Sequence, residues 1–493
     1  MTNRITILGG GAAGWMTAAY LSKNSPDVDI TVIESKNIKP QSVGESTTPH
    51  IMNFFKSIGI RDESEWMPKC DATYKIGVLY DDWDFINSRG WHSFEVERGK
   101  YEYWNKLRKK NNLDRQDYWA STMYNSHIAL RDSAKFFAGK DGKIKTPYES
   151  DSEHGWPQHW AYHINADKFG AYVKEIALNS GVNNVITDIK DVILDATGDV
   201  SYLKDTDGNT YHADLFVDCS GFKRLLIDKV ADEKFKTFEP YLTHDKAVVI
   251  RYDYKDQEME MRPRTKSKCL SSGWYWEIPL YDKISVGYVY TSKYISDEEA
   301  ENELRNEIGF ERTKDSKAFI VDINSGYYPK PWSKNVLAVG LSAGFIEPLE
   351  GTLLYAVIWA GRNIKSWLEG NLTTEQYNKK VETGLGDFVD FISIGYYMSH
   401  RTDSEFWRSR DRNAISKKMI HWLEEDGEIP KDTQLFLESS WLSKQIMFNR
   451  FPDTHKTIGD EEKIQKEMDK VKSFDFKELL SQKEYLDRFI YKV

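Results

Sequence analysis

The stretch RITILGGGAAGW, residues 4–15, decides the fold of this chain. A short β-branched run, Arg4 to Leu8, opens onto the glycine turn Gly9 to Gly14, and a helix-compatible segment follows. A second strand pattern, Asp29 to Ile33, then ends at Glu34, twenty residues beyond the last glycine. Strand, glycine turn, helix, strand and acid in this order are typical of a dinucleotide-binding βαβ unit.

Each part of this pattern has a physical role in holding a dinucleotide. Glycines permit the tight turn and a close approach of the backbone to a pyrophosphate, and the helix N-terminus supplies oriented N–H groups. The acid can accept hydrogen bonds from a ribose. A glycine turn without a ligand is the alternative, and the placement of the motif argues against it. The cofactor-binding residues that we expect here are Gly9, Gly11, Ala12, Ala13, Gly14 and Glu34.

Two later segments favour FAD over NAD. Residues 213–221 and 335–342 are buried-strand patterns that end in small residues, of the kind that return beneath a bound dinucleotide. Each alone could be an ordinary core strand. Leu341, in the second segment, is a further expected cofactor contact. A second GxGxxG for a nicotinamide is missing from the sequence, so we expect a separate reductase to deliver the flavin as FADH2.

Composition indicates a globular protein that acts on small molecules. The chain has 493 residues, 40% of them apolar, and a net charge of -10 with both signs mixed, which predicts no nucleic-acid or membrane partner. Three cysteines lie far apart and match no zinc or disulfide spacing, as expected in a reducing compartment. With no signal sequence or apolar span evident, we predict a cytoplasmic protein.

The domains are expected to be interleaved, because no Pro, Gly or Ser-rich linker separates the parts. Strand-like runs at 247–252 and 283–290 predict a mixed sheet in the middle of the chain, and the pattern becomes mainly helical from about residue 355. Ile464, Met468 and Val471 mark one face of an amphipathic helix near the end. We predict an α/β fold with two discontinuous modules. The FAD-binding module is expected at 1–75, 155–225 and 330–365, and the substrate-binding module at 76–154, 226–329 and 366–493 with the helical C-terminal region.

A rarer motif, Trp-x-Trp-x-Ile-Pro, occupies residues 274–279. Its chance occurrence is on the order of one in a thousand, and period two places Trp274 and Trp276 on one face of a strand. Two core tryptophans would give the same geometry. Together with Gly14-Trp15, however, the motif resembles the tryptophan halogenase branch of the flavin-dependent halogenases.

That resemblance implies the Rossmann-like FAD fold of the flavin monooxygenase superfamily and a specific chemistry. In that family reduced FAD, oxygen and a halide (chloride, bromide or iodide) give hypohalous acid, which travels through a tunnel to an electron-rich aromatic substrate. The resemblance implies that Trp274, Trp276, Ile278 and Pro279 lie along the tunnel. The tryptophans are thought to keep the substrate away from the flavin.

The resemblance also assigns two catalytic residues. The family's lysine follows a Gly-Glu-Ser-Thr-x-Pro segment, which begins here with Gly44, Glu45 and Ser46, also expected at the cofactor; it corresponds to Lys75. On a strand Lys75 shares a face with Thr73 and Gly77, whose small size should leave space around its amine. A protonated Lys75 could hydrogen-bond hypohalous acid, whereas a neutral one could form a haloamine. A surface strand lysine is the plain alternative.

The second catalytic residue is Glu350, in a Glu-Pro-Leu-Glu segment, placed to stabilise the cationic σ-complex and take its proton. It could instead be an acid that favours a helix N-terminus. The family usually continues Glu-Ser-Thr-Gly and binds halide on the last two amides. Here Gly351 precedes Thr352 and Leu353, the expected halide-binding positions, and the changed pocket leads us to expect tolerance of bromide or iodide.

An aromatic clamp is expected at His92 and Phe94, which match the His-x-Phe that sandwiches indole in the family. Two ordinary strand aromatics are the alternative. The stretch at 439–448 lacks the Tyr-Tyr pair that commonly grips free tryptophan, so we expect a more open site for simple indoles or phenols. An aromatic monooxygenase and a non-catalytic flavin-binding protein are the competing functions. A homo-oligomer is possible from the sequence.

Overall fold

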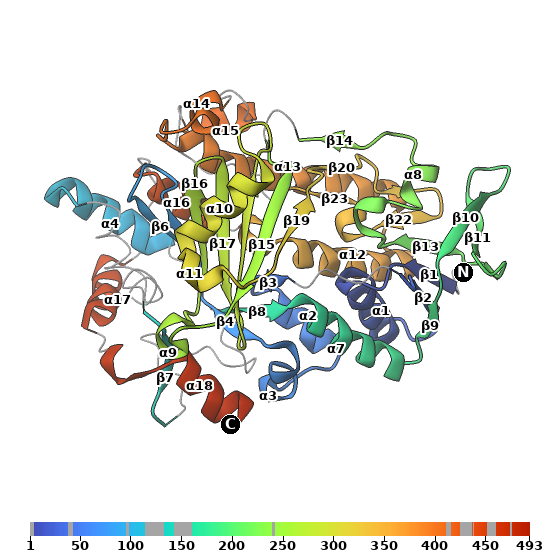
Figure 1. Cartoon of the computed structure of the whole chain (residues 1–493), viewed down its shortest axis with the longest axis horizontal. Coiled ribbons are helices and arrows are strands. Elements are labelled where there is room, and N and C mark those ends of the chain that lie inside the picture. The colour runs from blue at the N-terminus through green and yellow to red at the C-terminus, as the bar shows by residue number, and fades with distance from the viewer. Residues whose placement is uncertain are drawn as a thin grey trace. The chain divides into compact units, whose positions relative to one another are not determined.

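The computed structural model describes residues 4–37, 43–94, 98–113, 133–141, 160–238, 242–410, 416–423, 436, 438–450, 460–473 and 476–493. The chain forms two compact units, each assembled from three segments. Unit 1 comprises Met1–Asp71, Ile164–Leu242 and Asn324–Gly386; unit 2 comprises Ala72–His163, Thr243–Ile323 and Asp387–Val493. Figure 1 shows their elements coloured along the sequence.

Unit 1 is built around a six-stranded sheet with the order β21-β22-β13-β1-β2-β9. Its central strand β1 (Arg4–Leu8) lies parallel to β2 and β13, with Ile7 opposite both Val32 and Val217. Parallel strands with a partner on each side are usually buried on both faces, which explains why these strands are rich in Val and Ile. The remaining strands are β2 (Asp29–Glu34), β9 (Asn183–Ile186), β13 (Leu215–Asp218), β21 (Trp332–Ser333) and β22 (Val336–Ala338).

Helix α1 (Ala12–Asn24) follows β1 and packs against α7 (Ala166–Asn179) and α12 (Leu353–Leu368) (Figure 1). The strand, turn, helix and strand expected at the N-terminus are therefore present. Smaller sheets complete the unit: β10 (Ile189–Leu194), β11 (Val200–Asp205) and β12 (Thr210–Tyr211) form one, and β14 (Lys236–Thr237), β20 (Gly326–Tyr327) and β23 (Gly344–Phe345) form another.

Unit 2 contains a seven-stranded sheet with the order β19-β15-β18-β17-β16-β5-β6, antiparallel except for the β16–β5 pair. Its apolar face packs with α10 (Asp297–Ile308), through residues such as Val248, Tyr288 and Leu304. The strands are β5 (Gly77–Asp81), β6 (Arg89–Ser93), β15 (Lys246–Tyr252), β16 (Thr265–Leu270), β17 (Gly273–Pro279), β18 (Ile284–Tyr290) and β19 (Ala318–Asp322).

The C-terminal region is mainly helical, as predicted. Its longest helix is α13 (Thr374–Met398), and α17 (Glu461–Ser473) buries Ile464, Met468 and Val471 on one face. That face packs beside α4 (Arg98–Asn111), where Tyr103 donates a hydrogen bond to Gln465 at 2.8 Å. The predicted α/β class with interleaved segments is confirmed.

Among the described residues, no helix combines the length and the apolar character that a membrane span requires. The three cysteines are buried free thiols.

Candidate functional site

In unit 1 the glycine turn between β1 and α1 is fixed by close backbone contacts. Gly9 has φ +123°, and a Cβ there would lie 2.2 Å from the Cys219 carbonyl oxygen. A Cβ on Gly14 would lie 1.9 Å from the Gly9 carbonyl oxygen. Gly11 differs, because nothing lies within 4 Å of its Cβ position. The turn therefore packs tightly on the protein side and is open at Gly11, as a bound pyrophosphate would require.

The first turn of α1 suits an anion. Gly11 is its N-cap, no side chain caps the helix, and its first turn contains no acidic residue. A helix of this kind presents backbone N–H groups and the positive end of its dipole. The expected contacts Ala12 and Ala13 begin this helix, so their positions fit the phosphates of FAD.

Glu34 ends β2, but its carboxylate is also held within the protein. Lys174 of α7 forms an ion pair with Glu34 Oε1 and lies 4.9 Å from the centre of the Trp15 ring. The buried Trp15 of the Gly-Trp motif thus packs beneath the lysine that orients the acid. A carboxylate has lone pairs to spare for a ribose hydroxyl, so the ion pair is compatible with the expected role.

The other expected cofactor residues of unit 1 lie in a turn against α1 and in a short strand. Gly340 has φ +69°, and its Cβ position lies 3.1 Å from the Ala13 Cβ, which brings the turn containing Leu341 against the start of α1. Gly44, Glu45 and Ser46 form the short strand β3. Burial raises the pKa of the Glu45 carboxyl to about 7.

Glu350 and Gly351 form a left-handed turn immediately before α12. Glu350 is buried with φ +70°, an unusual backbone conformation for a residue with a side chain. Gly351 has φ +67°, and a Cβ there would lie 2.4 Å from the Ser46 carbonyl oxygen. This contact gives a physical reason for glycine at 351, where the family usually has another residue.

Thr352 and Leu353 lie where the chain enters α12. Thr352 is the N-cap of α12, with φ -86° and ψ -12°. Its right-handed helical backbone conformation directly follows the positive φ of Gly351. Successive amides in this arrangement form a concave nest that binds anions, and the N-terminus of a sixteen-residue helix adds its dipole. The backbone at the two positions expected to bind halide is suited to an anion.

In unit 2, Lys75 is fully buried at the end of β4 (Thr73–Lys75). Its Nζ lies 5.0 Å from the centre of the Phe94 ring, and Ala161 of β8 (Ala161–Asn165) lies opposite it in the ladder. The surface-lysine alternative is therefore wrong. The expected space at Gly77 is also absent, because its Cβ position lies 2.5 Å from the Trp91 ring. The small residue beside the lysine is Ala161.

His92 lies in β6 and Phe94 directly follows that strand, but their rings do not lie parallel. Their centres are 6.4 Å apart with an interplanar angle of 72°, so an aromatic substrate could not lie stacked between both rings without side-chain movement. The expected sandwich is absent in this conformation. His92 contacts Phe391, 5.8 Å between centres, and β6 is covered by α16 (Glu438–Met447), whose Met447 reaches 2.2 Å from the Gly90 Cβ position.

Trp274 and Trp276 lie on one face of β17, as predicted, with ring centres 6.3 Å apart. The Trp276 ring lies across β18 at Gly287, where a Cβ would approach it to 2.0 Å. Trp83 packs 6.1 Å from Trp274 and donates its Nε1–H to the Ser267 hydroxyl at 3.1 Å. The tryptophan pair is therefore fixed by neighbours on both sides.

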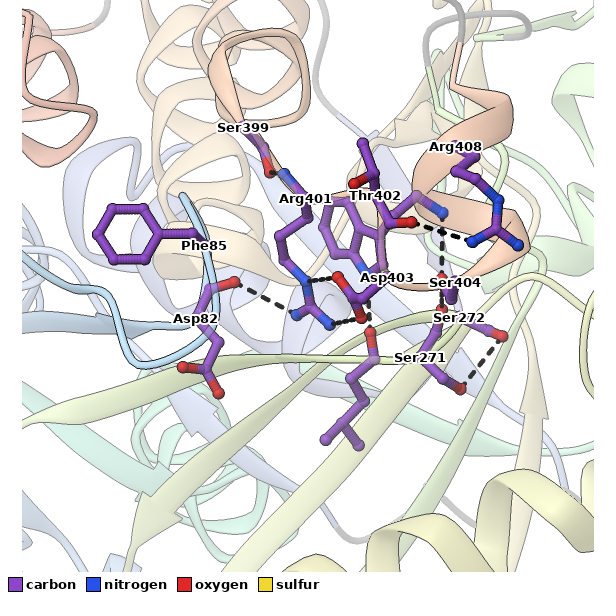
Figure 2. Close-up of polar contacts among 12 residues, drawn as sticks. Asp82, Phe85, Ser271, Ser272, Ser399, Arg401, Thr402, Asp403, Ser404 and Arg408 are labelled. Carbon is purple, nitrogen blue, oxygen red and sulfur yellow. Dashed lines mark hydrogen bonds and ion pairs between the residues drawn. The ribbon is translucent and has the colours of Figure 1, made fainter.

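The turn that leads into β17 is held by the segment after α13 (Figure 2). Ser404 donates a hydrogen bond to the Ser271 carbonyl at 2.5 Å, and Trp407 Nε1 donates one to the Leu270 carbonyl at 2.7 Å. Arg401 forms a bidentate pair with Asp403, at 2.8 and 2.6 Å. These contacts anchor the hairpin that carries Trp274.

The comparisons with known proteins agree with these motifs. A family described as "Tryptophan halogenase" matches residues 4–463. The chain belongs to the tryptophan halogenase family. A 7-chloro-L-tryptophan 6-halogenase from Kutzneria sp. (strain 744) is 31% identical over 437 residues, covering 85% of this chain and 84% of the relative.

Solved structures of the family are also similar over nearly the whole chain. The tryptophan 6-halogenase from Streptomyces toxytricini has 27% identity and a TM-score of 0.86, covering 98% of this chain and 99% of that one. A flavin-dependent halogenase from Brevundimonas sp. BAL3 has 26% identity and a TM-score of 0.82, with 99% of each chain covered. This tryptophan halogenase family member is thus a flavin-dependent halogenase by class, and its substrate is a separate question.

Sequence reasoning missed several residues that shape these halogenase motifs. The role of Gly287 could not be predicted, because it depends on the pairing of its strand with the strand of Trp276. The ion pair of Lys174 with Glu34 was missed because the two residues lie far apart in the sequence. His163, a polar residue within the buried strand Ala161–Asn165, was visible in the sequence but led to no prediction.

Gly287→Ala tests whether the glycine determines the position of Trp276. The added methyl group has no room beside the indole, so we expect the free energy of unfolding to fall by about 1–3 kcal/mol and the near-ultraviolet circular dichroism to change. Urea unfolding and dichroism measure both. Gly386→Ala, at a position with nothing within 4 Å, is the control and should be neutral or stabilising by up to about 1 kcal/mol. Equal effects of the two substitutions would contradict the assignment.

Glu45 predicts a pH dependence of stability. Its folded pKa of about 7 exceeds the value of about 4.3 in an unfolded chain, so between these pH values the folded state keeps a proton that the unfolded state releases. Its stabilising contribution is complete below the lower value and falls, by up to about 1.4 kcal/mol per pH unit, as pH rises toward 7. Urea unfolding from pH 4.5 to 8 should show this slope in the wild type and not in Glu45→Gln. Identical slopes would rule it out.

Proposed function

We propose that this protein uses FADH2 from a separate flavin reductase, oxygen and a halide to make hypohalous acid, and that it halogenates an electron-rich aromatic compound by electrophilic substitution. The observation that carries the proposal is the buried Lys75 in a chain that also has the Trp-x-Trp-x-Ile-Pro strand. Lysines are rarely fully buried, so a fully buried lysine at the position to which the resemblance assigns the catalytic lysine supports this role.

In this proposal unit 1 holds the cofactor and the halide. Gly9, Gly11, Ala12, Ala13 and Gly14 receive the phosphates, Glu34 the ribose, and Leu341 with Gly44, Glu45 and Ser46 the rest of FAD. Reduced FAD supplies the electrons with which oxygen converts halide to hypohalous acid. Thr352 and Leu353 hold the halide on their amides, as the nest geometry before α12 supports.

Lys75 and Glu350 carry the later steps. The ammonium of Lys75 donates a hydrogen bond to hypohalous acid and so makes its halogen more electrophilic. The aromatic carbon takes the halogen, water or hydroxide leaves, and a carboxylate at Glu350 stabilises the cationic ring and accepts its proton. Ile278, Pro279 and the two tryptophans line the route of the oxidant. Because Phe94 lies beside Lys75, a ring on the Phe94 side of the clamp would be near the activated oxidant.

The substrate class that we propose is a simple indole or a phenol. Two of the named relatives act on tryptophan or 7-chloro-L-tryptophan. The proposal of simpler rings rests instead on the missing Tyr-Tyr pair at 439–448. Phe391 lies on one side of the clamp, with its ring centre 5.8 Å from that of His92. His92 and Phe94 would hold the ring after a change of side-chain rotamer.

A direct test supplies FAD, a flavin reductase, NADH and bromide to the enzyme, with a panel of indoles, phenols and free tryptophan. Mass spectrometry should show brominated indole or phenol in the wild type. Lys75→Met should lower the product at least a hundredfold while flavin oxidation continues, because the methionine keeps the volume and removes the proton donor. Lys140→Met, at an exposed lysine, is the control. Hydroxylated products without bromine would indicate a monooxygenase, and strict use of free tryptophan would overturn the substrate class.

Halide preference is tested by competition. With chloride, bromide and iodide at equal concentrations, we expect brominated or iodinated product to exceed chlorinated product, because an altered turn at Gly351 and the apolar Leu353 favour larger, less hydrated anions. Mass spectrometry of one indole product gives the ratio directly. Exclusive chlorination would refute this expectation.

A further inference from the structure

A buried histidine links the lysine strand to the tryptophan strand in unit 2. His163, on β8, is fully buried, and its Nδ1 lies 3.2 Å from the Thr73 hydroxyl on β4. Its Nε2 lies 2.9 Å from the hydroxyl of Thr265, the first residue of β16. Thr73 in turn donates a hydrogen bond to the carbonyl of Pro279, the last residue of the Trp-x-Trp-x-Ile-Pro motif, at 2.6 Å.

The direction of these hydrogen bonds fixes the tautomer of the imidazole. A threonine hydroxyl has one proton, and a carbonyl oxygen can only accept, so the proton of Thr73 goes to Pro279. Thr73 must then accept from His163, which places a proton on Nδ1. In a neutral imidazole Nε2 then carries the lone pair and accepts the hydroxyl proton of Thr265.

The surroundings of His163 favour the neutral form. Burial, and then the positive charge of Lys75, lower the pKa of His163 well below its usual value, outweighing the opposite effect of the Pro279 carbonyl. Lys75 is the charged side chain that lowers the pKa of His163. The groups that face the imidazole from β16 and β17 are uncharged: the Thr265 hydroxyl and the Pro279 carbonyl.

Because Thr73 and Lys75 are two residues apart on β4, they point to the same side. The hydrogen bonds of Thr73 therefore fix the backbone from which the Lys75 side chain extends. We propose that His163 is a positioning residue which, as a neutral Nδ1–H imidazole, holds Thr73 on the Pro279 carbonyl and so fixes the strand of Lys75 against the end of the Trp-x-Trp-x-Ile-Pro strand. This inference rests on the function proposed for Lys75. The network delivers no proton to the substrate; it sets where the ammonium stands when hypohalous acid reaches it.

The tautomer can be measured without turnover. Nitrogen NMR of the full-length protein labelled with ¹⁵N-histidine, with His163 assigned by its loss in His163→Asn, should show a neutral imidazole protonated on Nδ1 at pH 7. A proton on Nε2 alone, or on both nitrogens, would overturn the assignment.

The positioning role is tested by measuring how much of the hypobromous acid brominates the substrate and how much escapes into solution. Indole is the aromatic probe, bromide the halide, and monochlorodimedone traps the hypobromous acid that escapes. In Thr73→Val and His163→Leu we expect the ratio of bromoindole to trapped oxidant to fall at least about tenfold, with total oxidant unchanged, because small displacements of a catalytic group are costly. His163→Asn keeps the donor to Thr73 and should recover most of the ratio.

Thr291→Val is the matched control, since it removes another threonine hydroxyl that pairs with a threonine in unit 2, Thr243, at 3.2 Å. It should leave the ratio unchanged. If folded Thr73→Val and His163→Leu both keep the wild-type ratio, the positioning role is wrong. A wild type that yields neither bromoindole nor trapped oxidant contradicts the proposed function instead, and the nitrogen spectrum still decides the state of His163.

Discussion

The close approach of three backbone segments at the N-terminal turn is the constraint on which unit 1 depends. Gly9 lies against Cys219, and Gly14 lies against Gly9, at separations that no side chain could occupy. These contacts hold the end of β1, the start of α1 and the end of β13 together, so the first helix begins where its amides are open at Gly11. The same packing continues through Gly340, which brings a second loop onto Ala13. The open turn to which we assign the cofactor thus arises from the absence of side chains.

Unit 2 uses glycine differently, to accommodate large rings within a sheet. Gly287 accepts the indole of Trp276, and Gly77 accepts that of Trp91. Aromatic side chains contribute much buried area but must adopt one orientation to be useful as a barrier or a wall. Placing each ring over a glycine fixes that orientation by steric exclusion. Hydrogen bonds from Ser404 and Trp407 to the Ser271 and Leu270 carbonyls also hold the hairpin turn that leads into the strand of Trp276 (Figure 2).

The parts that sequence predicted well are those set by local periodicity. The limits of β1, the strand containing Trp274 and Trp276, and the buried face of α17 follow from alternation and helical spacing. The contacts that arise from strand pairing could not be read in this way. Trp91 fills the space expected beside Lys75, Lys174 binds Glu34, and the rings of His92 and Phe94 meet edge to face. Each depends on register or on a rotamer, neither of which a single sequence specifies.

The contact between Gly351 and Ser46 has a consequence for directed evolution. The donors expected to hold the halide are amides, which every residue except proline provides, so changing side chains at 352 and 353 alters the donors little. The spacing of these amides depends instead on the conformation of the turn, where the Ser46 carbonyl oxygen packs against Gly351. Libraries intended to shift halide preference would therefore have to change the backbone of this turn, and not only the side chains at 352 and 353. With the backbone that this chain has, position 351 accepts only glycine without a shift of the Ser46 carbonyl.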